Sequence, residues 1–124
     1  MEETPPARST YYQAFTRDRH KCVYCSKDIL ESFDNFASSQ LDHLKPRAAG
    51  GPDDEPLNRV TSCYVCNSLK GAFDPSPDGL VTASNFNETL ARGREYVQKK
   101  RNGEEPNSYF RDYHYWLEEA DRDG

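Results

Sequence analysis

The strongest hydrophobic periodicity lies near the end of the chain, where large apolar side chains recur at intervals of three and four residues. This spacing matches one face of an α-helix, and Ser108 can cap its first turn. We therefore expect a last helix whose aromatic stripe packs in the protein core. The stripe consists of Phe110, Tyr113, Trp116, Leu117 and Ala120.

A weaker helical pattern precedes this segment. Phe86, Leu90 and Val97 form a sparse apolar face along an otherwise polar stretch. Asn87 can cap this helix, because a side-chain amide oxygen can accept a hydrogen bond from the free N–H groups of the first turn. Gly93 is expected to be a weak point in it, since glycine has a low helix propensity.

A short helix is also expected near the N-terminus. Ser9 can cap it, and Tyr11, Tyr12 and Phe15 follow at helical spacing before the charged residues that begin at Arg17. We expect this helix to pack as a lid on the core beside the cysteines.

The pattern changes to a period of two in the middle of the chain. From Ser38 to Leu44, alternation places Leu41 and His43 on one face of a strand and Asp42 on the other, until Pro46 stops it. This segment is therefore predicted to be a β-strand.

A loop, a second strand and a helix are predicted to follow. Residues 47–56 are rich in glycine, proline and acidic residues, which favours an exposed loop, and residues 59–62 form a short strand. A helix then spans about residues 64–70 and ends at Gly71. The predicted order is strand, loop, strand, helix.

The composition indicates one small domain with little material for a core. The chain has 124 residues, of which 35% are hydrophobic, and its mean hydropathy is -1.01. A metal or disulfide brace is therefore expected. No apolar run is long enough to cross a bilayer and the N-terminus is polar, so we expect a cytoplasmic protein with no membrane partner.

The cysteines supply a candidate brace. Two CxxC pairs, Cys22 with Cys25 and Cys63 with Cys66, leave no cysteine over. Four thiolates arranged as two such pairs favour a tetrahedral zinc site, with disulfides or a redox CxxC as the alternatives. A site closed by four cysteines has no open position for a substrate, so this zinc is expected to be structural.

Short motifs accompany the cysteines over residues 17–71. In order they read RDRHKCVYC, LDHLKP, GG and LNRVTSCYVCNSLKG. Together they resemble the HNH nuclease family, in its branch with a four-cysteine zinc site. The resemblance implies an α+β fold with a small ββα-metal core of the His-Me finger, treble-clef-like type and flanking helices. It implies a single nuclease domain over 1–124, with the core at about 17–75 and a helical extension at about 85–122.

The resemblance also implies a metal-dependent DNA endonuclease that leaves a 5′-phosphate and a 3′-hydroxyl. His43 would be the general base, and imidazole suits this task because its ordinary pKa of ~6.5 leaves it neutral near pH 7. Asp42 and Asn67 would hold one catalytic Mg²⁺ or Mn²⁺. Asn58 would support catalysis by holding the long loop.

The chain departs from many family members at the last position of the motif, where Asn67 replaces a histidine. This HNN form favours hard cations that prefer oxygen ligands. Lys70, Arg47 and Arg59 are candidate phosphate contacts, with ordinary surface charge as the alternative. Lys45, which follows the first strand, is a further candidate phosphate contact. A second basic cluster on the penultimate predicted helix could track a DNA backbone or form a solvated helix face, and it consists of Arg92, Arg94, Lys99, Lys100 and Arg101.

The overall charge restricts how nucleic acid can bind. With 21 acidic and 16 basic residues the formal net charge is -5, and loop acids such as Asp53 would repel DNA. Contact with duplex DNA must therefore be local, with RNA left open, and a partner protein could supply affinity. The rival readings are a zinc-stapled nucleic-acid-binding module without catalysis and an accessory subunit of a larger nuclease complex. His20 and His114 are expected to have no catalytic role.

Overall fold

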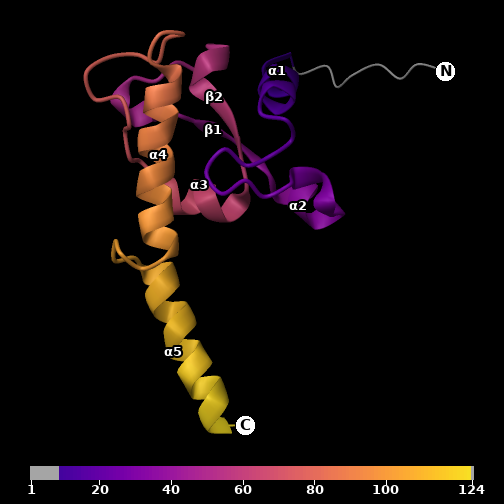
Figure 1. Ribbon diagram of the computed structural model, residues 1–124, viewed down its shortest axis with the longest axis vertical. Helices are drawn as coiled ribbons and strands as arrows, with labels where there is room; N and C mark the ends of the chain where they lie inside the picture. The colour runs from indigo at the N-terminus through magenta and orange to yellow at the C-terminus, as the bar shows by residue number, and fades with distance from the viewer. Residues whose placement is uncertain (1–8, 124) are drawn as a thin grey trace, which may run out of the picture.

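The computed structural model describes residues 9–123, which form a small α+β core followed by two long helices (Figure 1). Within these residues no helix is long and apolar enough to cross a membrane. The helices and strands are α1 (Ser9–Arg17), α2 (Phe33–Ser38), β1 (Gln40–His43), β2 (Arg59–Ser62), α3 (Tyr64–Lys70), α4 (Phe86–Arg101) and α5 (Ser108–Asp123).

The two strands and α3 form a ββα unit, as the sequence predicts. β1 and β2 pair antiparallel in a register that sets Asp42 opposite Val60 and His43 opposite Arg59. The side chain of Asp42 points to the buried face, while His43 is half-buried on the other. The loop between the strands contains two short 3₁₀ turns, at Arg47–Ala49 and Pro56–Asn58.

Local chemistry defines the ends of α3. Cys63 is its N-cap, and the Cys63 Sγ accepts a hydrogen bond from the backbone N–H of Cys66 at 3.4 Å. Gly71 ends the helix with a φ of 52°, in the left-handed region that glycine adopts readily. Both ends of the helix that follows the second CxxC segment are therefore defined by its own sequence.

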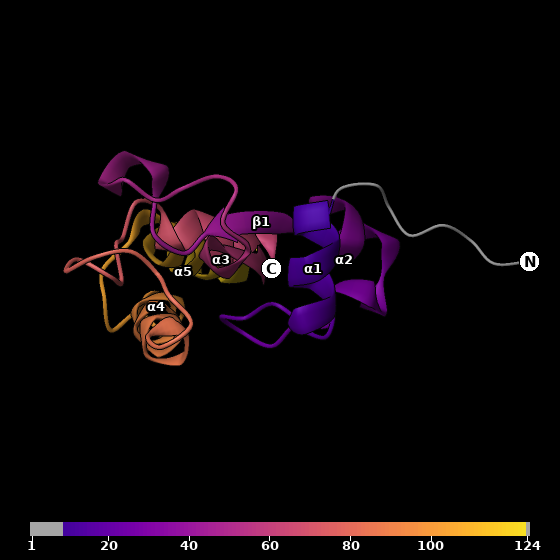
Figure 2. The same cartoon turned by 90° about the horizontal axis from the view of Figure 1, so that it is seen from above.

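The N-terminal helix α1 packs along β2 and the turn that precedes it. Arg17 donates hydrogen bonds to the backbone oxygens of Arg59 and Pro56, at 2.6 and 2.9 Å. The neighbouring Asp18 accepts one from the backbone N–H of Thr61 at 2.8 Å. Figure 2 shows α1 and α2 at one side of the core and α4 at the other.

The core lies between the ββα unit and α4. Tyr24, Leu44, Val60 and Val97 are all fully buried within it. Gly93 of α4 lies directly on this core, because a Cβ at that position would approach the Tyr24 Cε1 to 3.2 Å. The expected weak point of the helix is thus a place where α4 approaches the core closely.

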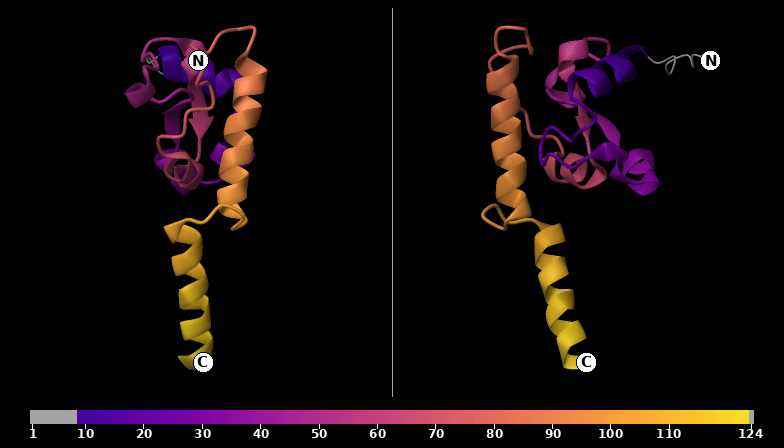
Figure 3. Two further views of the ribbon diagram at one scale, coloured as in Figure 1. Left: turned by 90° about the vertical axis from the view of Figure 1, so that its left-hand side faces the viewer. Right: turned by 45° about the vertical axis from the view of Figure 1, so that its right-hand side comes forward.

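Two expectations for the long helices are wrong. Asn85, not Asn87, is the N-cap of α4. The aromatic stripe of α5 does not pack in the core, because α5 continues away from the body of the protein, and the side chains of Tyr113 and Trp116 are 61% and 65% exposed (Figure 3). The helix forms as predicted, but its aromatic stripe is left largely exposed.

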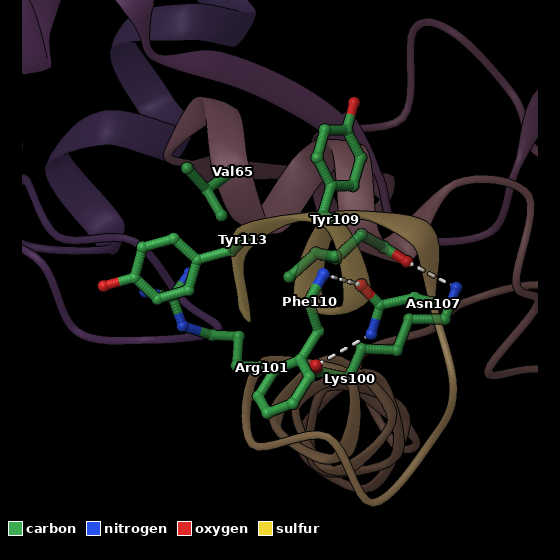
Figure 4. A pocket seen from close by; sticks show the side chains of 8 residues that line it. Val65, Lys100, Arg101, Asn107, Tyr109, Phe110 and Tyr113 are labelled. Atoms are coloured by element: carbon green, nitrogen blue, oxygen red, sulfur yellow. Dashed lines mark hydrogen bonds between the residues drawn. The ribbon is translucent and has the colours of Figure 1, made fainter. Parts of the chain in front are cut away.

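The junction between α4 and α5 is tied by Asn107. Its side chain donates to the Lys100 backbone oxygen at 2.9 Å and accepts from the Phe110 backbone N–H at 3.0 Å. Beside it lies a pocket of about 180 Å³ between α3, α4 and the start of α5 (Figure 4). No candidate catalytic residue lines this pocket.

Candidate metal centre and active site

The four cysteines form one cluster. Their Sγ atoms all lie within 4.8 Å of one another, and those of Cys25 and Cys63 are 3.8 Å apart. A tetrahedron with zinc–sulfur bonds of about 2.3 Å has edges of about 3.8 Å, so the donor set fits a zinc ion. All four thiols are free of disulfide bonds.

Hydrogen bonds among the four thiols shift their pKa values in opposite directions, down at Cys22 and Cys63 and up at Cys25 and Cys66. Hydrogen bonding, chiefly from the Cys25 thiol, lowers the pKa of Cys22 to about 6. Arg101 at the end of α4 places its Nη1 3.4 Å from the Cys66 Sγ, where its positive charge offsets negative charge on sulfur. The cluster therefore joins the two CxxC segments and touches α4.

A separate hollow of about 230 Å³ opens where β1 meets α3. It brings together the three residues that were expected to act on the phosphodiester bond: Asp42, His43 and Asn67. Arg47, a predicted phosphate contact, also lines it, whereas Arg59 does not. The remaining lining residues are Leu41, Pro46 and Gly71.

Asp42 is held by two partners from different parts of the chain. Only 7% of the residue is exposed, and its Oδ2 accepts a hydrogen bond from the Tyr24 hydroxyl and lies 3.2 Å from the Lys70 Nζ. Burial raises the pKa of Asp42, while the Lys70 ammonium and the Tyr24 hydrogen bond oppose this. Both contacts use Oδ2, and Asp42 is one of the residues that line the hollow.

Lys70 and Lys45 are not placed to contact a phosphate, which corrects the expectation from the sequence. Lys70 is 1% exposed, and its Nζ also donates to the His43 backbone oxygen at 2.9 Å. Lys45 is buried too and binds Asp74 at 2.8 Å and the Ser76 backbone oxygen at 2.6 Å. Both lysine side chains place their ammonium groups beside acceptors inside the protein. The sequence pattern did not reveal these contacts.

His43 has a partner that the sequence reasoning missed. Its Nε2 lies 2.7 Å from the Oδ1 of Asp53, and the same oxygen accepts from the Arg47 Nε at 2.8 Å. These two hydrogen bonds, the one from His43 first, lower the pKa of Asp53. The loop contains three consecutive acids, so its sequence carried no signal that would single out Asp53.

Asn58 holds the loop to the end of β1. It is fully buried, and its amide accepts from the Lys45 backbone N–H at 2.8 Å and donates to the backbone oxygens of Lys45 and Pro52 at 3.0 and 3.2 Å. Gly51 lies so close that an added Cβ would meet the Lys45 backbone oxygen at 1.8 Å. These contacts agree with the supporting position expected for Asn58.

The basic residues of α4 mostly bind within the protein. Arg94 donates to the Val23 backbone oxygen at 2.9 Å and Lys100 to that of Leu69 at 2.8 Å. Arg92 and Lys99 form ion pairs with glutamates one turn earlier on the same helix. The expected DNA-tracking face of α4 is therefore largely occupied by contacts within the protein.

Comparison with known proteins agrees with this geometry. Residues 22–73 match the profile of the HNH endonuclease family. The CRISPR-associated endonuclease Cas9 of Corynebacterium diphtheriae is 37% identical over 60 residues, which cover 48% of this chain and 5% of that much longer protein. The matched segment contains the four cysteines, both strands and α3. Residues 22–73 therefore match the domain of the HNH endonucleases, a nuclease family that hydrolyses phosphodiester bonds.

Proposed function

We propose that this domain hydrolyses DNA phosphodiester bonds with His43 as the general base and a divalent cation held by Asp42 and Asn67. The observation that carries the proposal is the single hollow that all three residues line. General-base catalysis needs an imidazole within reach of the attacking water, and hard cations such as Mg²⁺ prefer a few carboxylate and amide oxygens.

The contacts of Asp42 support its part in this site. The Tyr24 hydroxyl and the Lys70 ammonium hold the carboxylate through Oδ2, so the side chain is oriented before any cation binds. A divalent cation held there would offset the negative charge on the phosphate oxygens. Asn67 reaches the same hollow from α3, which Lys70 ties to β1 through the His43 backbone oxygen.

DNA is the proposed substrate because the family and the similar Cas9 are endonucleases. Arg47 is the basic residue best placed to meet a phosphate, since its side chain is exposed and the residue lines the hollow. The cysteine cluster would bind structural zinc and keep α3 in register with the first CxxC segment.

A second candidate function is that of a catalytic module that depends on a larger assembly for DNA affinity. It is favoured by the net charge of -5 and by the internal partners of the basic side chains on α4. Electrostatic attraction to phosphates normally supplies much of the affinity for DNA, and little of it is available on this chain. Weak cleavage in isolation that rises with an added partner would support this reading.

The test is cleavage of supercoiled plasmid by the zinc-loaded protein, with Mg²⁺, Mn²⁺ and Ca²⁺ added in turn at constant zinc. We expect cation-dependent cutting that falls about 10²–10⁴-fold in His43→Ala. Asn67→Ala should raise the cation concentration needed for half-maximal cutting. Asn67 is replaced instead of Asp42, because replacing Asp42 would leave the buried charge of Lys70 unpaired.

His20→Ala is the matched control, since His20 is exposed and lies outside the hollow. It should cut like the wild type. Full activity in a folded His43→Ala protein, or cutting that needs no added cation, would contradict the proposal.

A further inference from the structure

The hydrogen bond between His43 and Asp53 determines where the imidazole proton lies. A carboxylate can only accept, so at the 2.7 Å contact the His43 Nε2 must carry the hydrogen. In the neutral ring this leaves Nδ1 unprotonated and able to accept a proton.

The carboxylate of Asp53 is held in place although the residue is exposed. Arg47 donates from Nε to the same oxygen at 2.8 Å. On the backbone, Arg59 donates to the Asp53 oxygen at 2.9 Å, and Asn58 donates to the preceding Pro52 oxygen at 3.2 Å. Two arginines and the buried amide thus fix a loop acid whose own side chain is exposed.

A purely stabilising role would explain little of this arrangement. Ion pairs between exposed side chains contribute about 0–1 kcal/mol to stability, and a negative charge beside a phosphate site weakens DNA binding. Arg47 reduces that cost because it shares the Asp53 oxygen with His43. The contact is better explained by its effect on the ring of His43.

We propose that Asp53 is a positioning residue that holds the His43 ring with its proton on Nε2. Nδ1 is then free to take the proton of the attacking water. This inference rests on the proposed role of His43 as the general base. One O–H bond of the water breaks and its proton goes to Nδ1. The oxygen forms the new bond to phosphorus, and the bond from phosphorus to the 3′ oxygen breaks. That oxygen takes a proton from solvent, and the imidazolium, stabilised by Asp53, later returns its proton to solvent.

The first test observes the ring directly. Long-range ¹H–¹⁵N spectra of the zinc-loaded protein at pH 8 should show a protonated Nε2 and an unprotonated Nδ1 for His43, with a slowly exchanging Nε2 proton. The chain has three histidines, and His20→Ala and His114→Ala assign the other two. Asp53→Ala should lose the slowly exchanging proton. A wild-type ring protonated on Nδ1, or no change in Asp53→Ala, would overturn the inference whether or not the protein cuts DNA.

The second test separates turnover from DNA binding. Asp53→Ala should lower kcat about 10–100-fold and leave KM unchanged or lower, because a supporting contact is lost and a repelling charge is removed. Asp53→Glu should restore part of the loss. Asp54→Ala, which removes the neighbouring exposed acid, is the control for charge and should keep the wild-type kcat.

The outcomes distinguish the two proposals. If His43→Ala abolishes cutting while Asp53→Ala behaves like Asp54→Ala, the base assignment stands and the inference about Asp53 is overturned. A change confined to KM in Asp53→Ala would also overturn it, because it would indicate a role in DNA contact. If no protein cuts plasmid, the proposed function fails, and the spectra still decide the orientation of His43.

Discussion

The two long helices have equal length and opposite relations to the core. α4 and α5 each contain 16 residues. α4 has a sparse apolar face, yet its Val97 is completely buried. α5 has a regular aromatic stripe, yet its Trp116 is 65% exposed, and it extends from the core instead of packing against it (Figure 3).

Polar side chains explain why the less hydrophobic helix is the one that packs. Arg94, Gln98 and Lys100 reach from α4 to backbone oxygens of Val23, Tyr24 and Leu69, at 2.9, 2.6 and 2.8 Å. Each contact satisfies a carbonyl group that would otherwise lack a partner at the edge of the core. Hydrophobic periodicity identifies an apolar face, but it does not determine which helix packs against the core.

The largest expected effect comes from removing the cysteine cluster that supports α4. Cys63→Ser should unfold the core, because binding of zinc to such sites contributes about 10–16 kcal/mol and a domain is stable by only about 5–15 kcal/mol. Hydrogen exchange of the backbone amides is the measurement. The amides of α4 should lose their protection.

The amides of α5 serve as the internal control for that experiment. An unsupported 16-residue helix is marginal in water, so α5 should exchange rapidly in both the wild type and the Cys63→Ser variant. Protection of α4 that survives in Cys63→Ser would show that the helix holds to the core without the cluster.

An intermediate effect is expected from Gly93→Val. The new Cβ would lie 3.2 Å from Tyr24 and 3.6 Å from Leu44, and the two further methyl groups would push α4 from the core. We expect a loss of about 1–3 kcal/mol in the free energy of unfolding, measured by urea titration. Ala91→Val, at an exposed position of the same helix, should cost about 0.5 kcal/mol. Equal losses in both variants would contradict the close packing of Gly93.

The smallest effect is expected at Trp116 of α5, in contrast to the buried Val97 of α4. Val97→Ala creates a cavity in the core and should lower the free energy of unfolding by about 1–3 kcal/mol. Trp116→Ala, although it removes a much larger side chain, should change it by less than about 0.5 kcal/mol. Thermal melts of the two variants provide the measurement. A large loss for Trp116→Ala would mean that α5 is covered in solution.

Much of the fold of the core follows from local signals. Pro46 and Gly71 mark ends of elements, alternation marks β1, and the CxxC spacing identifies the ligand cluster. These predictions succeeded because each depends on residues close together in the chain. The short helix α2 was not predicted, since it has no strong apolar face and packs only at the margin of the core.

The candidate site was predicted less completely. The motif pointed to Asp42, His43 and Asn67, and the structure brings them to one hollow. It did not show that the Lys70 charge is buried against Asp42, nor that Asp53 binds His43. Both contacts join residues at least ten positions apart, so their existence depends on the path of the loop and the tilt of α3.

The amino-acid pattern was sufficient for most of the secondary structure and for the chemistry of the ligands, because backbone preferences and side-chain types act locally. Which charges face solvent depended on the folded arrangement. Lys45, Lys70 and Lys100 have the same side chain as the exposed Lys99, yet each reaches an internal oxygen. The energy of a charge depends on the acceptors and the water around it, and these are set only when distant segments pack together.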